Sequence, residues 1–338
     1  MIDSDLQARF NSIMVKGRKT NTYKFALAKF LLDFTDNFTE SQILNMKSHG
    51  QFATIDYSDT AMGFLKYYWH QECKYRIRQN SDVNKLPYVV RIIREEFDVN
   101  DAKKSFSDLS DKKKEKAAFR IQSRVFGSGQ YSNVVPCFQN LPNLGSDDKN
   151  VFYNFDSKRI MIRPEVLLFF KINKHCLLKT VVLEWSKFLE RRNNMPMLIS
   201  KIENDIVRRG NLAKYKKMFA YDFYKCFYCE CRLYQKSIHV DHFIPWSYIF
   251  EDDAWNLVLA CNECNCKKSD SLAQKSFLTS LIDRNYEYGS KINGLAKSLQ
   301  ELGTDAKMGK NLTHTWESEM VSRYKNCKNQ GFTLVTMP

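Results

Sequence analysis

Four cysteines in two close pairs have the spacing of metal ligands. Cys226 and Cys229 form one Cys-x-x-Cys pair, and Cys261 and Cys264 form a second pair further along the chain. Each such pair supplies two thiolates from one tight turn, and two pairs complete the tetrahedral ligand set of a structural zinc ion. The sequence therefore predicts a closed site in which these four cysteines bind one Zn²⁺ ion.

Two other cysteines leave the ligand set open. Cys231 and Cys266 each follow a pair by two residues and would serve as substitute ligands. Cysteine also packs as a small apolar side chain, so the alternative is a group of buried free thiols. The paired spacing, in a protein whose cysteines are expected to stay reduced, favours the zinc site.

Between and just after the pairs, the chain gathers side chains suited to acid–base chemistry and to binding a hard cation. His239, Asp241 and His242 lie close together, and Asn256 and Asn265 follow. An imidazole titrates near neutral pH, while carboxylate and amide oxygens are ligands for hard divalent ions. Each residue by itself is commonly an ordinary turn or surface residue, and Asn256 would equally cap a turn. Their order between two cysteine pairs favours a functional site.

The elements that must position these residues form a small ββα unit. Residues 238–241 alternate apolar and polar side chains, which predicts a half-buried strand, and Pro245 ends its pairing. Residues 255–260 predict a second, apolar strand, and residues 262–268 predict a short helix after the second cysteine pair. Such a unit is too small to bury a core of its own, so we expect the metal to supply much of its folding energy.

Residues 226–270 resemble the HNH family of endonucleases, also called ββα-metal nucleases, in its zinc-bound form. The resemblance rests on the motifs Cys-x-x-Cys, Asp-His-x-x-Pro, Trp-Asn-Leu, Cys-x-x-Cys-Asn and Lys-Ser-Asp. The closing stretch, residues 265–270, is similar to the HNH domain of RNA-guided CRISPR nucleases. Asn265 stands where the commoner pattern of the family has histidine, and its carbonyl oxygen suits magnesium or manganese better than zinc.

The resemblance implies a DNA endonuclease that uses Mg²⁺ or Mn²⁺ as its catalytic ion. His242 would be the general base, and Asp241 and Asn265 would hold the divalent ion at the scissile phosphate. Asn256 would orient His242 or the substrate backbone, and His239 would support the site or contact the metal. Successive residues of a strand face opposite sides, so Asp241 and His242 converge only if the strand ends or bends there.

A rival interpretation is a zinc module without catalytic activity that binds nucleic acid or a partner protein. It predicts the loss of at least one of Asp241, His242, Asn256 and Asn265, and all four are present. Enzymes of the HNH family are often restriction, phage-defence or mobile-element nucleases. The resemblance thus favours a bacterial or phage-related restriction or defence nuclease, with a homodimer and an additional defence-system partner left open.

The composition is compatible with a protein that binds nucleic acid. The formal net charge is +14 and the pI is about 9.2, so the chain attracts phosphate backbones. Proteins that never meet nucleic acid share this property. Asp3, Asp5 and Arg9 stand where a secretory signal would be apolar, and no apolar stretch is long enough to span a membrane. We therefore expect a soluble, cytoplasmic protein whose partner is DNA.

Basic side chains flank the cysteine pairs on both sides. The alternative for such a group is an ordinary solvated surface. The predicted DNA contacts are Arg208, Arg209, Lys214, Lys216, Lys217, Lys267 and Lys268.

The whole chain predicts an α+β protein with four segments. Residues 1–148 are expected to form a mainly helical domain that selects or positions DNA. Residues 149–220 would contain a β-hairpin and a basic helical connector. The HNH core would occupy 221–272, and 273–338 would form a helical cover.

Overall fold

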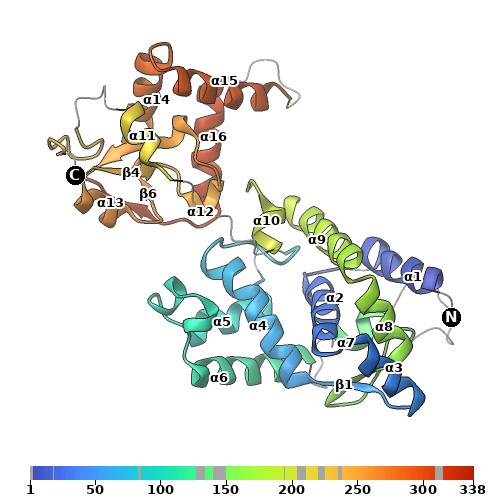
Figure 1. The fold of residues 1–338 in the computed structure, drawn as a ribbon. Helices are drawn as coiled ribbons and strands as arrows, with labels where there is room; N and C mark the ends of the chain where they lie inside the picture. The colour runs from blue at the N-terminus through green and yellow to red at the C-terminus, as the bar shows by residue number, and fades with distance from the viewer. Residues whose placement is uncertain are drawn as a thin grey trace. The chain divides into compact units, whose positions relative to one another are not determined.

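A computed structural model describes residues 3–17, 19–82, 85–126, 134–139, 150–193, 195–203, 211–219, 225–234, 238–308 and 315–338. Helices dominate, with three small sheets among these residues, which confirms the α+β class. The chain folds as two compact units, one of Met1–Asn193 with Leu198–Asp205 and one of Asn194–Met197 with Ile206–Pro338. Figure 1 labels their elements.

The first unit consists of helices and one antiparallel sheet. Its α-helices are α1 (Asp3–Lys16), α2 (Tyr23–Phe34), α3 (Glu40–Ser48), α4 (Tyr57–Cys73), α5 (Tyr88–Glu96), α6 (Asp111–Ile121), α7 (Val134–Phe138), α8 (Pro164–Ile172), α9 (Lys174–Glu190) and α10 (Leu198–Glu203). Shorter turns are η1 (Thr35–Asn37), η2 (Asp101–Lys103), η3 (Phe106–Asp108) and the π-helix η4 (Gln122–Phe126). The strands β1 (Ala53–Asp56), β2 (Asn154–Phe155) and β3 (Arg159–Ile162) lie in the order β1-β3-β2.

Helix α2 lies in the core of the first unit because it is apolar around most of its circumference. Phe25, Leu27 and Leu31 are fully buried. Helices α4 and α9 pack against α2, and the Phe25 ring stacks on Trp185 of α9 with ring centroids 6.0 Å apart. A helix with apolar side chains on all sides is a buried one. The apolar stripe of α9 is the surface that covers it.

The hairpin expected between residues 149 and 220 belongs to the first unit and not to a separate connector. Strand β3 pairs antiparallel with β1, with Ala53 opposite Ile162. The Tyr57 hydroxyl donates to the Asp156 carbonyl over 2.8 Å. Helices α8, α9 and α10 also stay with the first unit. The local pattern could not reveal this arrangement, because the partner strand β1 lies far earlier in the chain.

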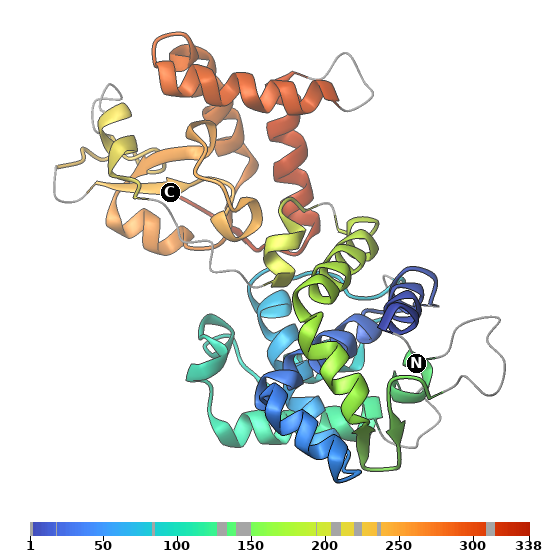
Figure 2. The ribbon, with the colours of Figure 1, turned by 45° about the vertical axis from the view of Figure 1, so that its right-hand side comes forward.

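The second unit contains the cysteine pairs and the residues between them. Its elements are α11 (Ala213–Met218), β4 (His239–His242), α12 (Trp246–Ile249), η7 (Ala254–Asn256), β5 (Leu257–Ala260), α13 (Asn262–Lys268), β6 (Leu272–Ala273), α14 (Lys275–Gly289), α15 (Asn293–Met308), α16 (Trp316–Asn329) and β7 (Leu334–Val335). Strands β4 and β5 are antiparallel, and β6 and β7 are parallel. In Figure 2, the orange and red helices α14 to α16 lie along the top and right of the β4–β5 hairpin.

Strands β4 and β5 with helix α13 form the predicted ββα unit. All four residues of β5 are buried. Helix α14 holds the start of β5 through two side chains: Arg284 donates to the Leu257 carbonyl over 3.0 Å, and Asn285 donates to the Trp255 carbonyl over 3.1 Å. The ββα unit thus gains the core that it lacks by itself from the helices around it. Among the described residues, no helix has both the length and the apolar character needed to cross a bilayer.

Candidate functional site

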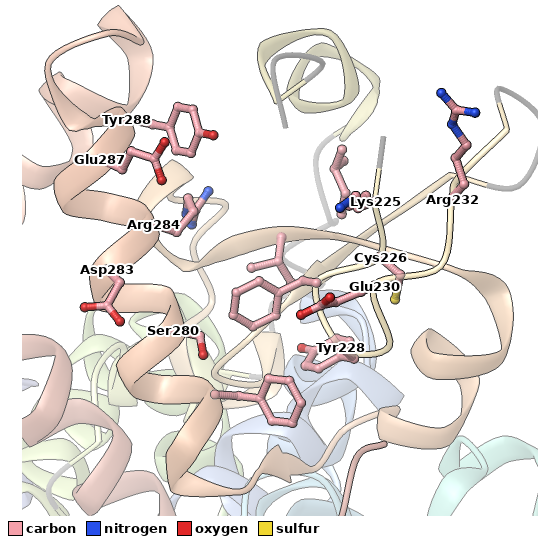
Figure 3. A pocket seen from close by; sticks show the side chains of 14 residues that line it. Lys225, Cys226, Tyr228, Glu230, Arg232, Ser280, Asp283, Arg284, Glu287 and Tyr288 are labelled. Atoms are coloured by element: carbon pink, nitrogen blue, oxygen red, sulfur yellow. The ribbon is translucent and has the colours of Figure 1, made fainter. Parts of the chain in front are cut away.

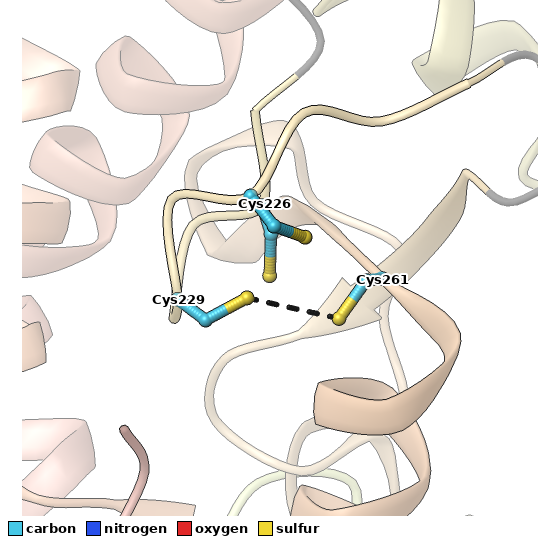
Figure 4. A group of neighbouring side chains, drawn as sticks. Cys226, Cys229 and Cys261 are labelled. Carbon is cyan, nitrogen blue, oxygen red and sulfur yellow. Dashed lines mark hydrogen bonds between the residues drawn. The ribbon is translucent and has the colours of Figure 1, made fainter.

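The thiols of the second unit gather in one cluster. The sulfur atoms of Cys226, Cys229, Cys231 and Cys261 all lie within 4.8 Å of one another. The Cys229 and Cys261 sulfurs are 3.9 Å apart. Figure 4 shows them facing each other, with Cys226 beside them. Cys264, the remaining predicted ligand, is not part of this group, and its amide donates to the Cys261 sulfur over 3.4 Å. Four clustered thiols are a donor set that could hold a structural zinc ion.

Of the two predicted substitute ligands, Cys231 lies in the cluster and Cys266 lies outside it. Cys264 is buried beside the cluster, whereas Cys231 is exposed at its edge. The exposed Cys266 thiol lies 3.6 Å from the Asn262 side-chain oxygen instead. Cys226, Cys229 and Cys261 are therefore common to both possible sets, and the fourth position falls to Cys231 or Cys264.

A tight turn and a helix start bring these thiols together. The Cys226 amide donates to the Cys231 carbonyl over 2.9 Å, which closes the first turn. The Phe227 amide donates to the Leu259 carbonyl over 2.8 Å, which attaches this turn to β5. Cys261 caps the N-terminus of α13, because its sulfur accepts from the Cys264 amide over 3.4 Å.

The cluster favours ionisation of one thiol in particular. Burial opposes ionisation of Cys229, but hydrogen bonds from the Cys231 backbone and from neighbouring thiols outweigh it and lower the Cys229 pKa to about 7. Burial raises the pKa of the Cys226 and Cys264 thiols. A thiolate is the form that binds a metal, and a cation at this place would favour it for the other cysteines as well.

Asp241 lies in β4 and has two donors. Its Oδ2 atom accepts from the Tyr228 hydroxyl over 2.6 Å. The Lys268 Nζ atom of α13 lies 3.1 Å from Oδ2 and 3.3 Å from Oδ1, and it also donates to the His242 carbonyl over 2.7 Å. Asp241 is 7% exposed and Lys268 is fully buried. The prediction that Lys268 contacts DNA is therefore wrong, since its ammonium group is inside the protein and engaged with β4.

His242, the last residue of β4, pairs with a carboxylate. Its Nε2 atom lies 2.8 Å from Asp252 Oδ1, and the side chain is 6% exposed. Asp252 belongs to the short loop between α12 and η7, and its carbonyl accepts from the Tyr215 hydroxyl of α11. Strand β4 ends at His242, as convergence with Asp241 requires, and Lys268 contacts both residues.

The side chain of Asn256 hydrogen-bonds to the backbone that follows His242. Its Oδ1 atom accepts from the Ile244 amide over 2.8 Å, and its Nδ2 atom donates to the Ile244 carbonyl over 2.9 Å. The side chain is fully buried. Asn256 therefore fixes the backbone two residues after His242, and both hydrogen bonds of its side chain go to that backbone.

Comparison with protein families gives one match to this region. Residues 226–274 match the model of the HNH endonuclease family. This chain has an HNH domain. Comparisons with curated proteins and with solved structures gave no match. The HNH domain spans both cysteine pairs, the β4–β5 hairpin, α13 and β6.

Asn265 and His239 are two further predicted site residues. Asn265 shares a face of α13 with Lys268, and His239 shares a face of β4 with Asp241. Asn265 is half-buried on α13, three residues before Lys268, so both lie on the same side of the helix. His239 lies two residues before Asp241 and shares its face of β4. Neither side chain makes a hydrogen bond or an ion pair with the part of the chain that the structure describes.

The predicted DNA-contacting residues of the second unit differ in how far their side chains are exposed to solvent. Lys214 and Lys217 of α11 and Lys267 of α13 are exposed, and Lys216 is half-buried. Arg208 and Arg209 lie outside the described residues. Helix α11 is held near the HNH domain by Tyr215, whose hydroxyl donates to the Asp252 carbonyl.

Sequence reasoning missed Tyr228 and Asp252, the two polar partners of the central residues of the HNH domain. Tyr228 lies between the two cysteines of the first pair, and an aromatic residue at that position does not by itself indicate a functional role. Asp252 is one of two adjacent aspartates in a loop, and only its short contact with His242 distinguishes it. The Asp270 carboxylate of the Lys-Ser-Asp motif accepts from the Ser247 hydroxyl at 2.6 Å, which ties the end of α13 to α12.

A cavity of about 830 Å³ lies on the side of the cysteine turn that faces α14. Figure 3 shows Cys226 and Tyr228 on one wall and Asp283, Arg284 and Glu287 on the other. Basic and acidic side chains share its rim. It contains neither Asp241 nor His242, so it is separate from the candidate catalytic residues.

Proposed function

We propose that this chain is a DNA endonuclease that hydrolyses phosphodiester bonds with its HNH domain. The observation that supports this proposal best is the imidazole of His242 at the end of β4, 2.8 Å from the Asp252 carboxylate and one residue after the buried Asp241. A purely structural zinc module has no use for an imidazole–carboxylate pair next to a buried acidic residue.

His242 acts as the general base in this proposal. The imidazole accepts a proton from the attacking water, and the Asp252 carboxylate stabilises the imidazolium ion that forms. Asn256 keeps the backbone after His242 in one conformation through its two hydrogen bonds to Ile244. Two contacts thus position the His242 ring. Asp252 bonds to its Nε2 atom, and Asn256 holds the backbone that follows His242.

Asp241 and Asn265 are the residues that would hold a divalent ion. A carboxylate and an amide oxygen are hard donors that fit Mg²⁺ or Mn²⁺ and not a thiophilic ion. Asn265 lies on the side of α13 from which Lys268 reaches Asp241. When bound, the ion would neutralise charge on the scissile phosphate and on the leaving oxygen.

The cysteine cluster would hold a structural zinc ion that takes no part in the reaction. The thiolate donors suit zinc, and a set of four leaves no open coordination position. The metal would link the first turn to the start of α13, and the backbone bond between Phe227 and Leu259 already attaches that turn to β5.

DNA is the proposed substrate, and restriction or phage defence is the proposed role. The exposed lysines of α11 lie on an element that contacts the loop of Asp252, so they would meet the phosphate backbone beside the site of cleavage. The first unit, with its own core, would select or position the DNA. Residues 226–274 form the catalytic part in this arrangement.

A plasmid assay tests the function directly. The protein is incubated with supercoiled plasmid and Mg²⁺ or Mn²⁺, and nicked and linear DNA are measured by gel electrophoresis. His242→Ala should lower the cleavage rate by about 10² to 10⁴, the usual loss of a general base, while DNA affinity and zinc content stay at wild-type values. Full activity in His242→Ala would show that this residue is not the base, and no cleavage by the wild-type protein would favour the binding module.

A further inference from the structure

One side chain joins the cysteine cluster to Asp241. Tyr228 lies between Cys226 and Cys229 in the first turn, and its hydroxyl donates to Asp241 Oδ2 over 2.6 Å. The residue is 2% exposed, and its ring packs edge-on against Phe277 with centroids 5.4 Å apart. Both the turn and this packing fix the position of the hydroxyl. Figure 3 shows Tyr228 on the turn that carries Cys226.

The two oxygens of Asp241 have unequal surroundings. Oδ2 accepts from Tyr228 at 2.6 Å and lies 3.1 Å from Lys268 Nζ. Among the described residues, Oδ1 has a single and longer contact, 3.3 Å to the same ammonium group. Oδ2 therefore accepts a short hydrogen bond and has a cation in ion-pair contact, whereas Oδ1 accepts one long hydrogen bond and keeps a lone pair for a cation. The hydroxyl of Tyr228 thus decides which oxygen is available.

We propose that Tyr228 is a positioning residue that turns the Asp241 carboxylate so that Oδ1 faces the catalytic ion. This inference rests on the proposed function, in which Asp241 is a ligand of that ion. The turn of Tyr228 is closed by the bond between the Cys226 amide and the Cys231 carbonyl and is attached to β5 at Leu259. Metal bound by the thiols would hold the turn closed and so fix the position of the Tyr228 hydroxyl. The structural site would in this way influence the affinity of Asp241 for the catalytic ion.

The test measures metal affinity and does not depend on activity. Mn²⁺ is titrated into the zinc-loaded full-length protein, and free Mn²⁺ is followed by electron paramagnetic resonance. Tyr228→Phe keeps the ring and removes the hydroxyl. Its Kd for Mn²⁺ should rise about tenfold, the low end of the range seen when a hydrogen-bond partner of a metal ligand is removed. Zinc content, measured by atomic absorption, should equal that of the wild type.

Tyr324→Phe is the matched control. It also removes one buried hydroxyl of the second unit, which donates to the Ala273 carbonyl over 2.7 Å. The inference predicts an unchanged Mn²⁺ Kd for this variant, even if both variants lose the same amount of thermal stability. An equal rise in both variants, an unchanged Kd in Tyr228→Phe, or a rise that merely follows lost zinc would overturn it.

Asp241→Ala separates this inference from the proposed function. If Asp241→Ala weakens Mn²⁺ binding and Tyr228→Phe does not, Asp241 is a ligand and the positioning role of Tyr228 is refuted. If Asp241→Ala leaves Mn²⁺ binding unchanged, Asp241 is not a ligand, and the proposed catalytic ion and the role of Tyr228 are refuted together.

Discussion

The imidazole of His242 owes its proposed role to a carboxylate placed ten residues later in the chain. The imidazole is almost fully buried, whereas the Asp252 side chain is 21% exposed, so this pair lies at the edge of the protein interior where water has access. A carboxylate bonded to Nε2 stabilises the ring after it takes up a proton. In the proposed mechanism, Asp252 would therefore contribute to catalysis through His242 and not by direct contact with substrate.

Asp252→Asn tests this contribution. An amide still fills the space and can hydrogen-bond, but it does not stabilise the imidazolium ion. The rate constant kcat should fall by at least about tenfold, within the limit of about 10⁴ set by loss of the base itself, with KM for DNA unchanged. Asp253→Asn is the control, since the neighbouring Asp253 carboxylate accepts from the Trp255 indole at 3.2 Å. Similar losses in both variants would contradict the specific role of Asp252.

At the residue scale, the sequence predicts the chemical groups better than their partners. Spacing predicted the gathering of Cys226, Cys229 and Cys261, because ligands of one ion follow a regular pattern. The partners of Asn256 and Lys268 could not be predicted. Asn256 contacts the backbone of Ile244, which depends on how the loop after β4 folds. The burial of Lys268 depends on the packing of α13 against β4, which no local pattern encodes.

At the scale of elements, α11 is the segment most closely connected with proposed DNA binding. Tyr215 is buried and its hydroxyl donates to the loop of Asp252, so the exposed lysines of α11 have a fixed place near the HNH domain. Lysines on a fixed helix contact phosphate without reading the bases. Helical periodicity alone did not predict the position of α11, because a helix of only six residues shows too little of a repeating pattern.

Replacing Lys214, Lys216 and Lys217 by Gln should weaken binding to all DNA sequences alike. Each lost phosphate contact lowers the slope of log K against log salt by about 0.9, so the slope should decrease by about one to three. Fluorescence anisotropy at several salt concentrations measures both quantities.

The control for α11 carries the same change in charge elsewhere in the second unit. Lys291, Lys297 and Lys325 are exposed on or beside α14 to α16 and are changed to Gln together. Equal loss of affinity in the two triple variants would show that net charge, and not the position of α11, is responsible.

At the scale of the whole molecule, the two units should respond differently to metal removal. The cysteine cluster lies in the second unit, and a structural zinc ion contributes about 10–16 kcal/mol, comparable to the whole stability of a domain. A strong chelator should therefore abolish one of two calorimetric unfolding transitions and leave the transition of the helical first unit in place.

Two cysteine variants accompany the chelation experiment. Cys261→Ser should behave as the chelated protein does, because Cys261 belongs to the cluster and caps α13. Cys266→Ser should behave as the wild type, because its thiol lies outside the cluster. A single transition that shifts as a whole on chelation would show that the two units do not unfold independently.

The parallel pairing of β6 with β7 has a consequence during protein synthesis. Leu272, two residues past the Lys-Ser-Asp motif, is paired with Leu334, and the Gln274 side chain bonds to the backbone of Met337, 63 residues further along. At about 5–20 residues per second, a ribosome needs about 3 to 13 seconds to translate that interval. During this time the end of the HNH domain has no strand partner. A cell making this protein would thus acquire a complete second unit only after residues 334–337 have left the ribosome.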